Sequence, residues 1–338
     1  MNHVYFGIDI GGTKTEVSLI SIEHPLGHLD SGSASFQAHK VLVRRRIPTE
    51  RNHGHRGFLS NLKSLIQASL TDVGIPLSSI RGMGVGIPGS VHPELQQMVQ
   101  GSIPFFKDLD LRAEFGSALG FSGTMVFEND ANCFALAESR FGAGADWARS
   151  HHVSESELCL LGITLGTGVG GGIIMNGELI RGRRGGAGEI GHISLKAADR
   201  SCYCGKSGCA EQFLSGPGLE HAYSLRARPG QRVSGKQIFE LARSGDPFAV
   251  STTESYRDDL LQFLSNLANL LDPHVIVLGG GISLEDQIYQ GLENRLSESC
   301  FLTSDPPSVL KNSLGDAAGA LGAAYLAFSE NQGEKAPS

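Results

Sequence analysis

Two glycine-rich turns, about 155 residues apart, have residue types that suit phosphate binding. The first consists of Gly11, Gly12, Thr13 and Lys14, directly after Asp9-Ile10, and the second of Gly166, Thr167 and Gly168. Turns without side chains expose consecutive backbone N–H groups, which can hold an anion. Thr13 adds a hydroxyl, Lys14 a positive charge, and Asp9 the carboxylate that a magnesium ion needs, usually through water. An ordinary hairpin explains either turn alone, but the recurrence favours a pair that holds a nucleotide's phosphates.

A carboxylate that could act in catalysis lies in Glu128-Asn129-Asp130, at a predicted junction between a strand and a helix. Asp130 could simply cap this helix, which is a common role for aspartate. Alternatively, it lies at the carboxyl end of a strand, where α/β proteins bind ligands. There it could accept the proton of a substrate hydroxyl that attacks a γ-phosphate.

The segment from residue 188 to residue 211 contains metal-binding residue types. One histidine and three cysteines, a combination typical of a closed structural zinc site, are His192, Cys202, Cys204 and Cys209. Their C-x-C-x₄-C spacing is tighter than that of the usual zinc finger, so free thiols or a disulfide stay open as alternatives. Glu189 and Glu211 flank this loop, and two carboxylates there could accept hydrogen bonds from sugar hydroxyls or be solvated at the surface.

The elements that would position these residues alternate between strands and helices, which predicts an α/β fold. Each glycine turn joins two predicted strands, so the two hairpins indicate an internal duplication. The pattern of apolar residues predicts strands at 4–10, 15–20, 81–87, 125–127, 160–165, 170–175 and 275–278, and helices at 58–70, 131–141, 260–271 and 315–326. The stretch from about 146 to 157 is expected to be a solvated loop.

Composition excludes several classes of protein. The chain has 338 residues, 40% of them apolar, and a net charge of −7, which disfavours a broad nucleic-acid-binding surface. No apolar run is long enough to span a membrane, and no signal peptide is apparent. A G-x-G-x-x-G pattern occurs at Gly84 and at Gly166, but neither opens a helix, and the P-loop pattern is missing. These features predict an acidic, cytoplasmic, ligand-binding enzyme rather than a dehydrogenase or a P-loop ATPase.

Taken together, the motifs closely resemble the ROK family of bacterial sugar kinases, within the actin/hexokinase/Hsp70-like superfamily. Seven stretches carry the resemblance, in family order and from about residue 4 to residue 326: 9–14, 86–89, 128–132, 165–172, 188–192, 202–211 and 277–281. The resemblance implies a two-domain actin-like (ribonuclease H-like) ATPase fold with an interdomain cleft. It implies one domain of residues 1–125 plus about 315–330, a second of residues 126–314 for sugar, zinc and nucleotide, and a frayed tail at 331–338.

The resemblance also implies roles for individual residues, with ATP, Mg²⁺ and a structural Zn²⁺ as cofactors. Asp130 would be the base, and the sugar would be held by Gly89, Asn129, Asp130, Glu189, His192 and Glu211. The nucleotide and its magnesium ion would be held by Asp9, Gly11, Gly12, Thr13, Lys14, Gly166, Thr167, Gly168, Gly279, Gly280 and Gly281. The zinc ligands would be His192, Cys202, Cys204 and Cys209.

The substrate expected from the resemblance is a hexose or an N-acetylhexosamine, phosphorylated at its 6-hydroxyl, with glucose and N-acetylglucosamine favoured. The stretches 13–17 and 202–206 look more like fructokinases and mannokinases, so that branch is the alternative. A sugar-sensing regulator is less expected, because the repressors of the family carry a DNA-binding segment before the first phosphate turn and this turn begins at residue 9. The family also implies a homodimer, and the composition predicts no nucleic-acid or membrane partner.

Overall fold

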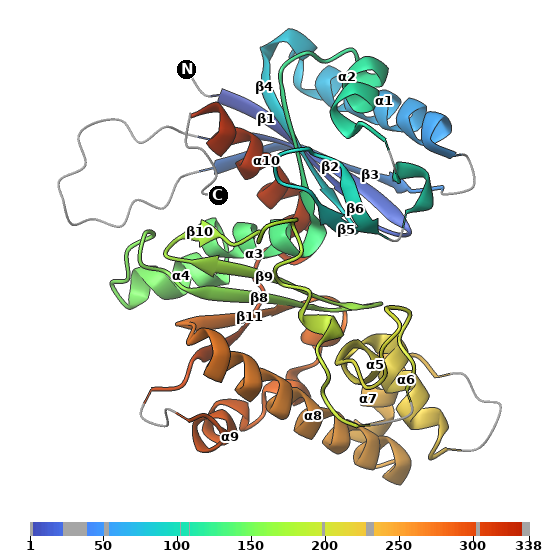
Figure 1. The fold of residues 1–338 in the computed structure, drawn as a ribbon, viewed down its shortest axis with the longest axis vertical. Helices are drawn as coiled ribbons and strands as arrows, with labels where there is room; N and C mark the ends of the chain where they lie inside the picture. The colour runs from blue at the N-terminus through green and yellow to red at the C-terminus, as the bar shows by residue number, and fades with distance from the viewer. Residues whose placement is uncertain are drawn as a thin grey trace. The chain divides into compact units, whose positions relative to one another are not determined.

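The computed structural model describes residues 3–22, 39–50, 54–101, 103–107, 109–197, 200–227, 233–301 and 305–332 (Figure 1). The chain divides into two compact units. The first consists of residues 1–158, 172–188 and 313–338, and the second of residues 159–171 and 189–312. The domain boundaries predicted from the sequence, near residues 125 and 314, stay predictions.

The first sheet has five strands in the order β3-β2-β1-β4-β7. The strands are β1 (His3–Ile10), β2 (Lys14–Ile22), β3 (His39–Pro48), β4 (Ile80–Ile87) and β7 (Thr124–Asn129). β1, β2 and β3 are antiparallel neighbours, whereas β4 and β7 run parallel to β1. The register places Asp9 beside Gly86, and Gly86 beside Glu128. The carboxyl ends of the three parallel strands, where predicted site residues lie, therefore meet at one edge of the sheet.

Helices cover both faces of this sheet (Figure 1). On one face, α1 (Gly54–Val73) and α2 (Leu111–Leu119) pack with Phe6 and Ile8 in the core. On the other face lies α10 (Ala318–Asn331), whose Phe328 contacts Tyr5 edge to face. Successive side chains of a strand point to opposite faces, which explains why Phe6 and Ile8 of β1 face α1 and α2 while Tyr5 faces α10. A small hairpin, β5 (Gly89–Val91) with β6 (Met98–Gly101), follows β4.

Glycine allows α10 to approach its neighbours closely. A Cβ atom on Gly84 would lie 1.7 Å from the carbonyl oxygen of Ala323, and one on Gly322 would lie 1.9 Å from that of Cys133 in α3 (Asp130–Arg140). Neither position can accept a side chain without moving a backbone. The small residues of α10 therefore hold it against both β4 and α3.

The second sheet repeats the design of the first, with the order β10-β9-β8-β11-β12. Its strands are β8 (Leu160–Leu165), β9 (Val169–Met175), β10 (Glu178–Leu179), β11 (Val275–Gly279) and β12 (Ser308–Lys311). In each sheet three strands that are consecutive in the chain lie side by side, and two later strands follow on the other side of the first of them. The predicted duplication and the α/β class are confirmed.

The remaining helices complete the two units. They are α4 (Ala143–Ser150), α5 (Glu211–Leu214), α6 (Gly216–Ser224), α7 (Gly235–Arg243), α8 (Pro247–Leu271) and α9 (Leu292–Ser299). Within the ranges described above, no helix is both long and apolar enough to cross a membrane. The prediction of a loop from about 146 to 157 was wrong in its first part, because α4 extends to Ser150 and Trp147 stacks on His151 one turn later. Most of the predicted frayed tail, residues 333–338, lies outside the described residues.

Candidate active site

The first glycine turn is held by Thr49, whose sequence position gives no sign of this role. Thr49 follows β3 and donates from its hydroxyl to the carbonyl of Gly11, at 2.8 Å, and from its N–H to the carbonyl of Thr13, at 3.0 Å. The turn also closes on itself, because the N–H of Gly11 donates to the carbonyl of Lys14. The side chains of Thr13 and Lys14 are exposed. The backbone of the turn is thus fixed while its polar side chains face solvent.

A network of charges lies next to this turn. Glu16, which is only 2% exposed, accepts hydrogen bonds from the guanidinium groups of Arg44 and Arg46. Arg46 also donates to the carboxylate of Asp316, which accepts a second hydrogen bond from Lys14 Nζ at 2.8 Å. Lys14 and Arg46 lower the pKa of Asp316. Two guanidinium groups offset the desolvation of the buried carboxylate. Lys14 is therefore held in place by a carboxylate from the segment just before α10.

Asp9 lies at the end of β1, partly buried, with its carboxylate close to Gly319 at the start of α10. A Cβ atom on Gly319 would lie 2.5 Å from its Oδ2, so only glycine leaves room for this carboxylate. The pKa of Asp9 is raised to about 7, mainly by burial and then by the nearby carboxylates of Asp130 and Glu16, against the smaller opposing effects of Lys14 and Arg46. A carboxyl group with this pKa loses its proton near neutral pH and is then well suited to a divalent cation.

Without nucleotide and Mg²⁺, we expect the protein to lose stability between about pH 4 and about pH 7, and to lose more than an Asp9→Asn variant does. The pKa of Asp9 lies near 7 in the folded chain and near 3.8 when unfolded, so the folded state binds more protons between these values. Stability present at low pH is therefore lost as the pH rises toward 7. Thermal unfolding of both proteins across this range measures the difference, and equal slopes would contradict the raised pKa.

The segment Glu128-Asn129-Asp130 joins β7 to α3 as predicted, but Asp130 does not cap the helix, which was the alternative to a catalytic role. Asn129, not Asp130, is the N-cap: its Oδ1 accepts from the N–H groups of Ala131 and Asn132. Asp130 is the first residue of α3, and its Oδ1 accepts from the N–H of Ala131 at 2.9 Å. Asn129 also donates from Nδ2 to the carbonyl of Gly89, at 3.0 Å. The predicted residues Gly89, Asn129 and Asp130 are therefore adjacent in space, at the same edge of the sheet as Asp9.

In the second unit, Glu211 lies against the second glycine turn. The N–H of Val169 donates to its Oε2 at 3.1 Å, and a Cβ atom on Gly168 would lie 2.6 Å from the same oxygen. The turn closes through the N–H of Gly166, which donates to the carbonyl of Gly168 at 3.0 Å. Glu211 was expected near sugar hydroxyls, and its observed contacts are with the backbone of this turn.

The glycines that follow β11 lie beside the same turn. Gly279 pairs with Thr164, and a Cβ atom on Gly280 would lie 2.5 Å from the carbonyl oxygen of Leu165. The φ of Gly280 is +83°, a conformation that favours glycine. Ser283 donates to the carbonyl of Gly280 at 2.7 Å and fixes the turn. The two glycine runs of this unit, residues 166–168 and 279–281, thus meet at one edge of the second sheet.

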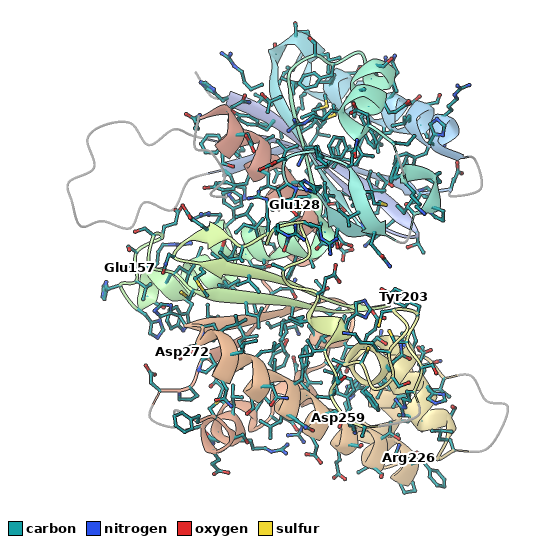
Figure 2. All side chains as sticks on the ribbon, in the orientation of Figure 1. Glu128, Glu157, Tyr203, Arg226, Asp259 and Asp272 are labelled. Atoms are coloured by element: carbon teal, nitrogen blue, oxygen red, sulfur yellow. The ribbon has the colours of Figure 1, made fainter. Side chains whose placement is uncertain are left out.

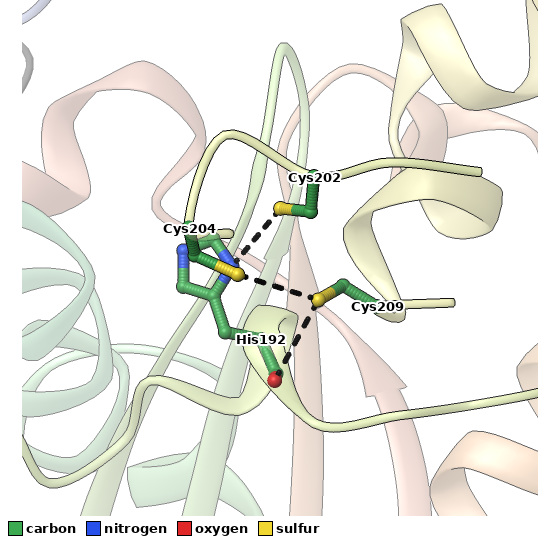
Figure 3. Close-up of side chains that lie close together, drawn as sticks. All are labelled: His192, Cys202, Cys204 and Cys209. Carbon is green, nitrogen blue, oxygen red and sulfur yellow. Dashed lines mark hydrogen bonds between the residues drawn. The ribbon is translucent and has the colours of Figure 1, made fainter. Parts of the chain in front are cut away.

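The predicted metal ligands converge (Figure 3). The donor atoms of His192, Cys202, Cys204 and Cys209 all lie within 4.8 Å of one another. Cys202 Sγ is 3.5 Å from His192 Nδ1, and Cys204 Sγ is 3.5 Å from Cys209 Sγ. Tetrahedral zinc, with bonds of about 2.3 Å to sulfur and about 2.0 Å to nitrogen, separates such pairs by about 3.5 to 3.8 Å. The four residues fit a zinc ion, and the sulfur atoms are too far apart for a disulfide.

Tyr203 and two glycines of the loop help to orient the residues of this cluster. His192 Nε2 lies 3.0 Å from the hydroxyl of Tyr203, which leaves Nδ1 directed at the sulfur atoms. The glycines of the loop, Gly205 and Gly208, have φ of +87° and +75° and allow its tight turns. Glu189 precedes the short 3₁₀ helix Ile190–His192, and its carbonyl accepts from the N–H of His192. A hydrogen bond to the second ring nitrogen is what metal-binding histidines usually have.

Known proteins match almost the whole chain. A model of the ROK family matches residues 5–330. The N-acetyl-D-glucosamine kinase of Pectobacterium atrosepticum is 33% identical, covering 97% of this chain and 100% of that protein. The ROK hexokinase of Thermus thermophilus is 28% identical, with a TM-score of 0.78 over 98% of this chain and 100% of that one.

A second solved structure is similar to a comparable degree. It is a ROK family glucokinase from Streptomyces griseus in complex with glucose and AMPPNP, 29% identical, with a TM-score of 0.73 over 96% of this chain and 99% of that one. The α/β fold is that of the actin-like ATPases, as the motifs predicted. From the family match and the full-length relatives, the chain belongs to the ROK family.

Proposed function

We propose that the protein is an ATP-dependent sugar kinase, which transfers the γ-phosphate of MgATP to a hydroxyl of a hexose or an N-acetylhexosamine. The observation that carries this proposal is the pair of carboxylates Asp9 and Asp130 at one sheet edge, next to a braced glycine turn. Such a pair suits the two needs of phosphoryl transfer, which are a cation on the phosphates and a proton acceptor near the attacking hydroxyl.

The nucleotide is held by the glycine turns. Backbone N–H groups of Gly12, Thr13, Thr167 and Gly168 bind the phosphates, helped by the hydroxyls of Thr13 and Thr167 and by the charge of Lys14. Asp9 holds Mg²⁺ through water, and residues 279–281 lie along the adenosine. Lys14 can exchange its contact with Asp316 for a phosphate oxygen, because both groups are anionic and the pair is solvent-exposed.

The sugar is held by Asn129, Glu189, His192 and Glu211, together with the turn at Gly89. Asp130 accepts the proton of the 6-hydroxyl as the hydroxyl oxygen bonds to the γ-phosphorus and the bond to the β-phosphate oxygen breaks, which leaves ADP. The N-cap position of Asn129 fixes Asp130 in the first turn of α3. Most of the rate enhancement then comes from orientation and charge neutralisation.

Zinc is proposed as a structural ion. When bound, it would join His192, Cys202, Cys204 and Cys209 by four bonds and so fix the loop before α5, which begins at Glu211. MgATP and reduced thiols are both typical of the cytoplasm, which is the compartment we propose. The homodimer expected for the family stays a prediction.

N-acetylglucosamine is the sugar that we propose first, because the full-length relatives at 31 to 33% identity are named N-acetyl-D-glucosamine kinases. Glucose follows. A fructokinase or mannokinase is the alternative, on the basis of residues 13–17 and 202–206, and a sugar-sensing regulator without kinase activity is a further one.

We expect N-acetylglucosamine to give the highest kcat/KM in an ADP-release assay with MgATP. Glucose, N-acetylmannosamine, mannose and fructose are the comparison substrates, and ³¹P NMR of the product locates the phosphate. The matched control is the Asp130→Asn variant, which should be nearly inactive with every sugar. A preference for fructose or mannose would establish the alternative branch. No turnover of any sugar, with binding of one of them seen by calorimetry, would replace the kinase with a sensor.

A further inference from the structure

Glu128, which is labelled in Figure 2, precedes the proposed sugar ligand Asn129 and the proposed base Asp130. It is a buried acid with both carboxylate oxygens engaged. Its Oε1 accepts from the N–H of Asn129 and from Nδ2 of Asn132, both at 2.9 Å. Its Oε2 accepts from Nε of Arg181 at 2.6 Å. The side chain of Glu128 therefore holds the first turn of α3 and connects it to the segment that carries Arg181.

That segment is the loop that leads toward Glu189. Arg181 lies just after β10, and its side chain is only 12% exposed. Its carbonyl accepts from the N–H of Ala187, so the loop closes on itself. A Cβ atom on Gly185 would lie 1.8 Å from the carbonyl oxygen of Val91, so the loop also rests on β5. The Arg181–Glu128 ion pair thus fixes the end of β7, where the base is carried, to this loop.

Helix stability alone does not explain this arrangement. Asn129 already caps α3, and a buried ion pair usually contributes little net stability because both charges lose their water. The charges matter locally, however. Burial is the main reason why the pKa of the Cys133 thiol is raised. The carboxylates of Glu128, Asp9 and Asp130 raise this pKa further, and the guanidinium of Arg181 lowers it. Arg181 thus places a positive charge among three carboxylates.

We propose that Glu128 is a positioning residue for the phosphoryl transfer, and that Arg181 holds and neutralises it. The hydrogen bond to the N–H of Asn129 and the bond to Asn132 set the orientation in which Asn129 and Asp130 leave the strand. The guanidinium keeps a third carboxylate from acting as an uncompensated charge beside Asp130 and the incoming phosphates. This inference rests on the kinase function proposed above.

The test is a cycle of Glu128→Gln, Arg181→Met and the double variant. Glutamine keeps the size of Glu128 but cannot accept at both ends, so we expect kcat to fall about 10- to 100-fold, with sugar KM changing less than about fivefold. Arg181→Met leaves a buried carboxylate unpaired, so kcat should fall at least as far. In the double variant the charge is gone, and kcat should return to about the level of Glu128→Gln alone rather than fall by the product of both effects.

The matched control is Glu155→Gln, which breaks the ion pair between Glu155 and Arg140 at the other end of α3. It should lower the melting temperature and leave kcat within about twofold. If Glu128→Gln behaves in the same way, or if the two losses simply multiply, the positioning role is wrong. If Arg181→Met does not fold, Arg181→Lys keeps the charge without the Nε bond, and its kcat should lie between those of the wild type and Glu128→Gln.

A crystal structure of Glu128→Gln separates this inference from the proposed function. The inference expects Asn129 to lose its 3.0 Å contact with the carbonyl of Gly89 and Asp130 to turn away from its position in the wild type. Unchanged side chains would overturn it, whether or not the wild type is a kinase. Lack of turnover by the wild type would overturn the kinase function and would leave the structural comparison as the deciding result.

Discussion

Replacing Asp130 by asparagine is expected to lower kcat by about 10²- to 10⁴-fold, the range typical of losing a general base. Asparagine has the same size and retains an oxygen that can accept the N–H of Ala131, so the start of α3 should not move. It cannot accept the proton of the sugar hydroxyl. Steady-state kinetics give kcat, and calorimetry with sugar alone should show affinity within about threefold of the wild type.

The control for this variant is Asp110→Asn. Asp110 is also an aspartate at the start of a helix in the first unit, where it caps α2 by accepting from the N–H of Ala113 at 3.0 Å. The Asp110→Asn variant tests whether an aspartate-to-asparagine change at the start of a helix by itself alters activity. Its kcat should stay within about twofold of the wild type. A large rise in sugar KM of Asp130→Asn with kcat preserved would mean that Asp130 binds the sugar and does not act as the base.

Much of the architecture was predictable because its signals are local. Alternating apolar residues on either side of Gly11 to Lys14 predict a hairpin, and the same pattern around Gly166 to Gly168 predicts a second one. The structure confirms both, and the shared strand order of the two sheets confirms the duplication. Edge strand β3 was missed because three consecutive arginines, Arg44 to Arg46, interrupt the apolar residues Leu42, Val43 and Ile47 that pack on the core.

The residues that support the site were harder to predict because they come from distant segments. Thr49 reaches the first glycine turn only through the pairing of β2 with β3, and Asp316 reaches Lys14 from about 300 residues away in sequence. Neither has a spacing that marks it. The contact of Glu211 with the N–H of Val169 is similarly non-local, which is why its carboxylate was expected only at sugar hydroxyls.

The four metal ligands were predictable as a set, since three cysteines within eight residues and one histidine ten residues earlier are a familiar zinc-binding combination. Their convergence in space was not, because it depends on bridges between the two arms of the segment. Leu195 donates from its N–H to the carbonyl of Gly208, and Ala210 to that of Ile193. These backbone bonds bring His192 alongside Cys209.

Removal of the metal is expected to have the second large effect. A Cys204→Ser variant should bind much less than one zinc ion per chain, melt at a clearly lower temperature and lose most of its kinase activity. Zinc bound by such ligands is worth about 10 kcal/mol or more in small zinc domains, so the loop from 192 to 209 should lose its fold without it. Because α5 begins two residues after Cys209, disorder of the loop would also displace Glu211 from the second glycine turn.

Metal analysis by mass spectrometry, thermal unfolding and kcat on the same samples test this expectation, and a Cys159→Ser variant is the control. Cys159 is partly buried like Cys204, but it lies outside the cluster, so zinc content and activity should be unchanged. Treating the wild type with a chelator should reproduce the Cys204→Ser defect, and adding Zn²⁺ should restore only the wild type. A Cys204→Ser variant that retains both its melting temperature and its kcat would show that hydrogen bonds alone hold this loop, and that the cysteines do not depend on a metal for their arrangement.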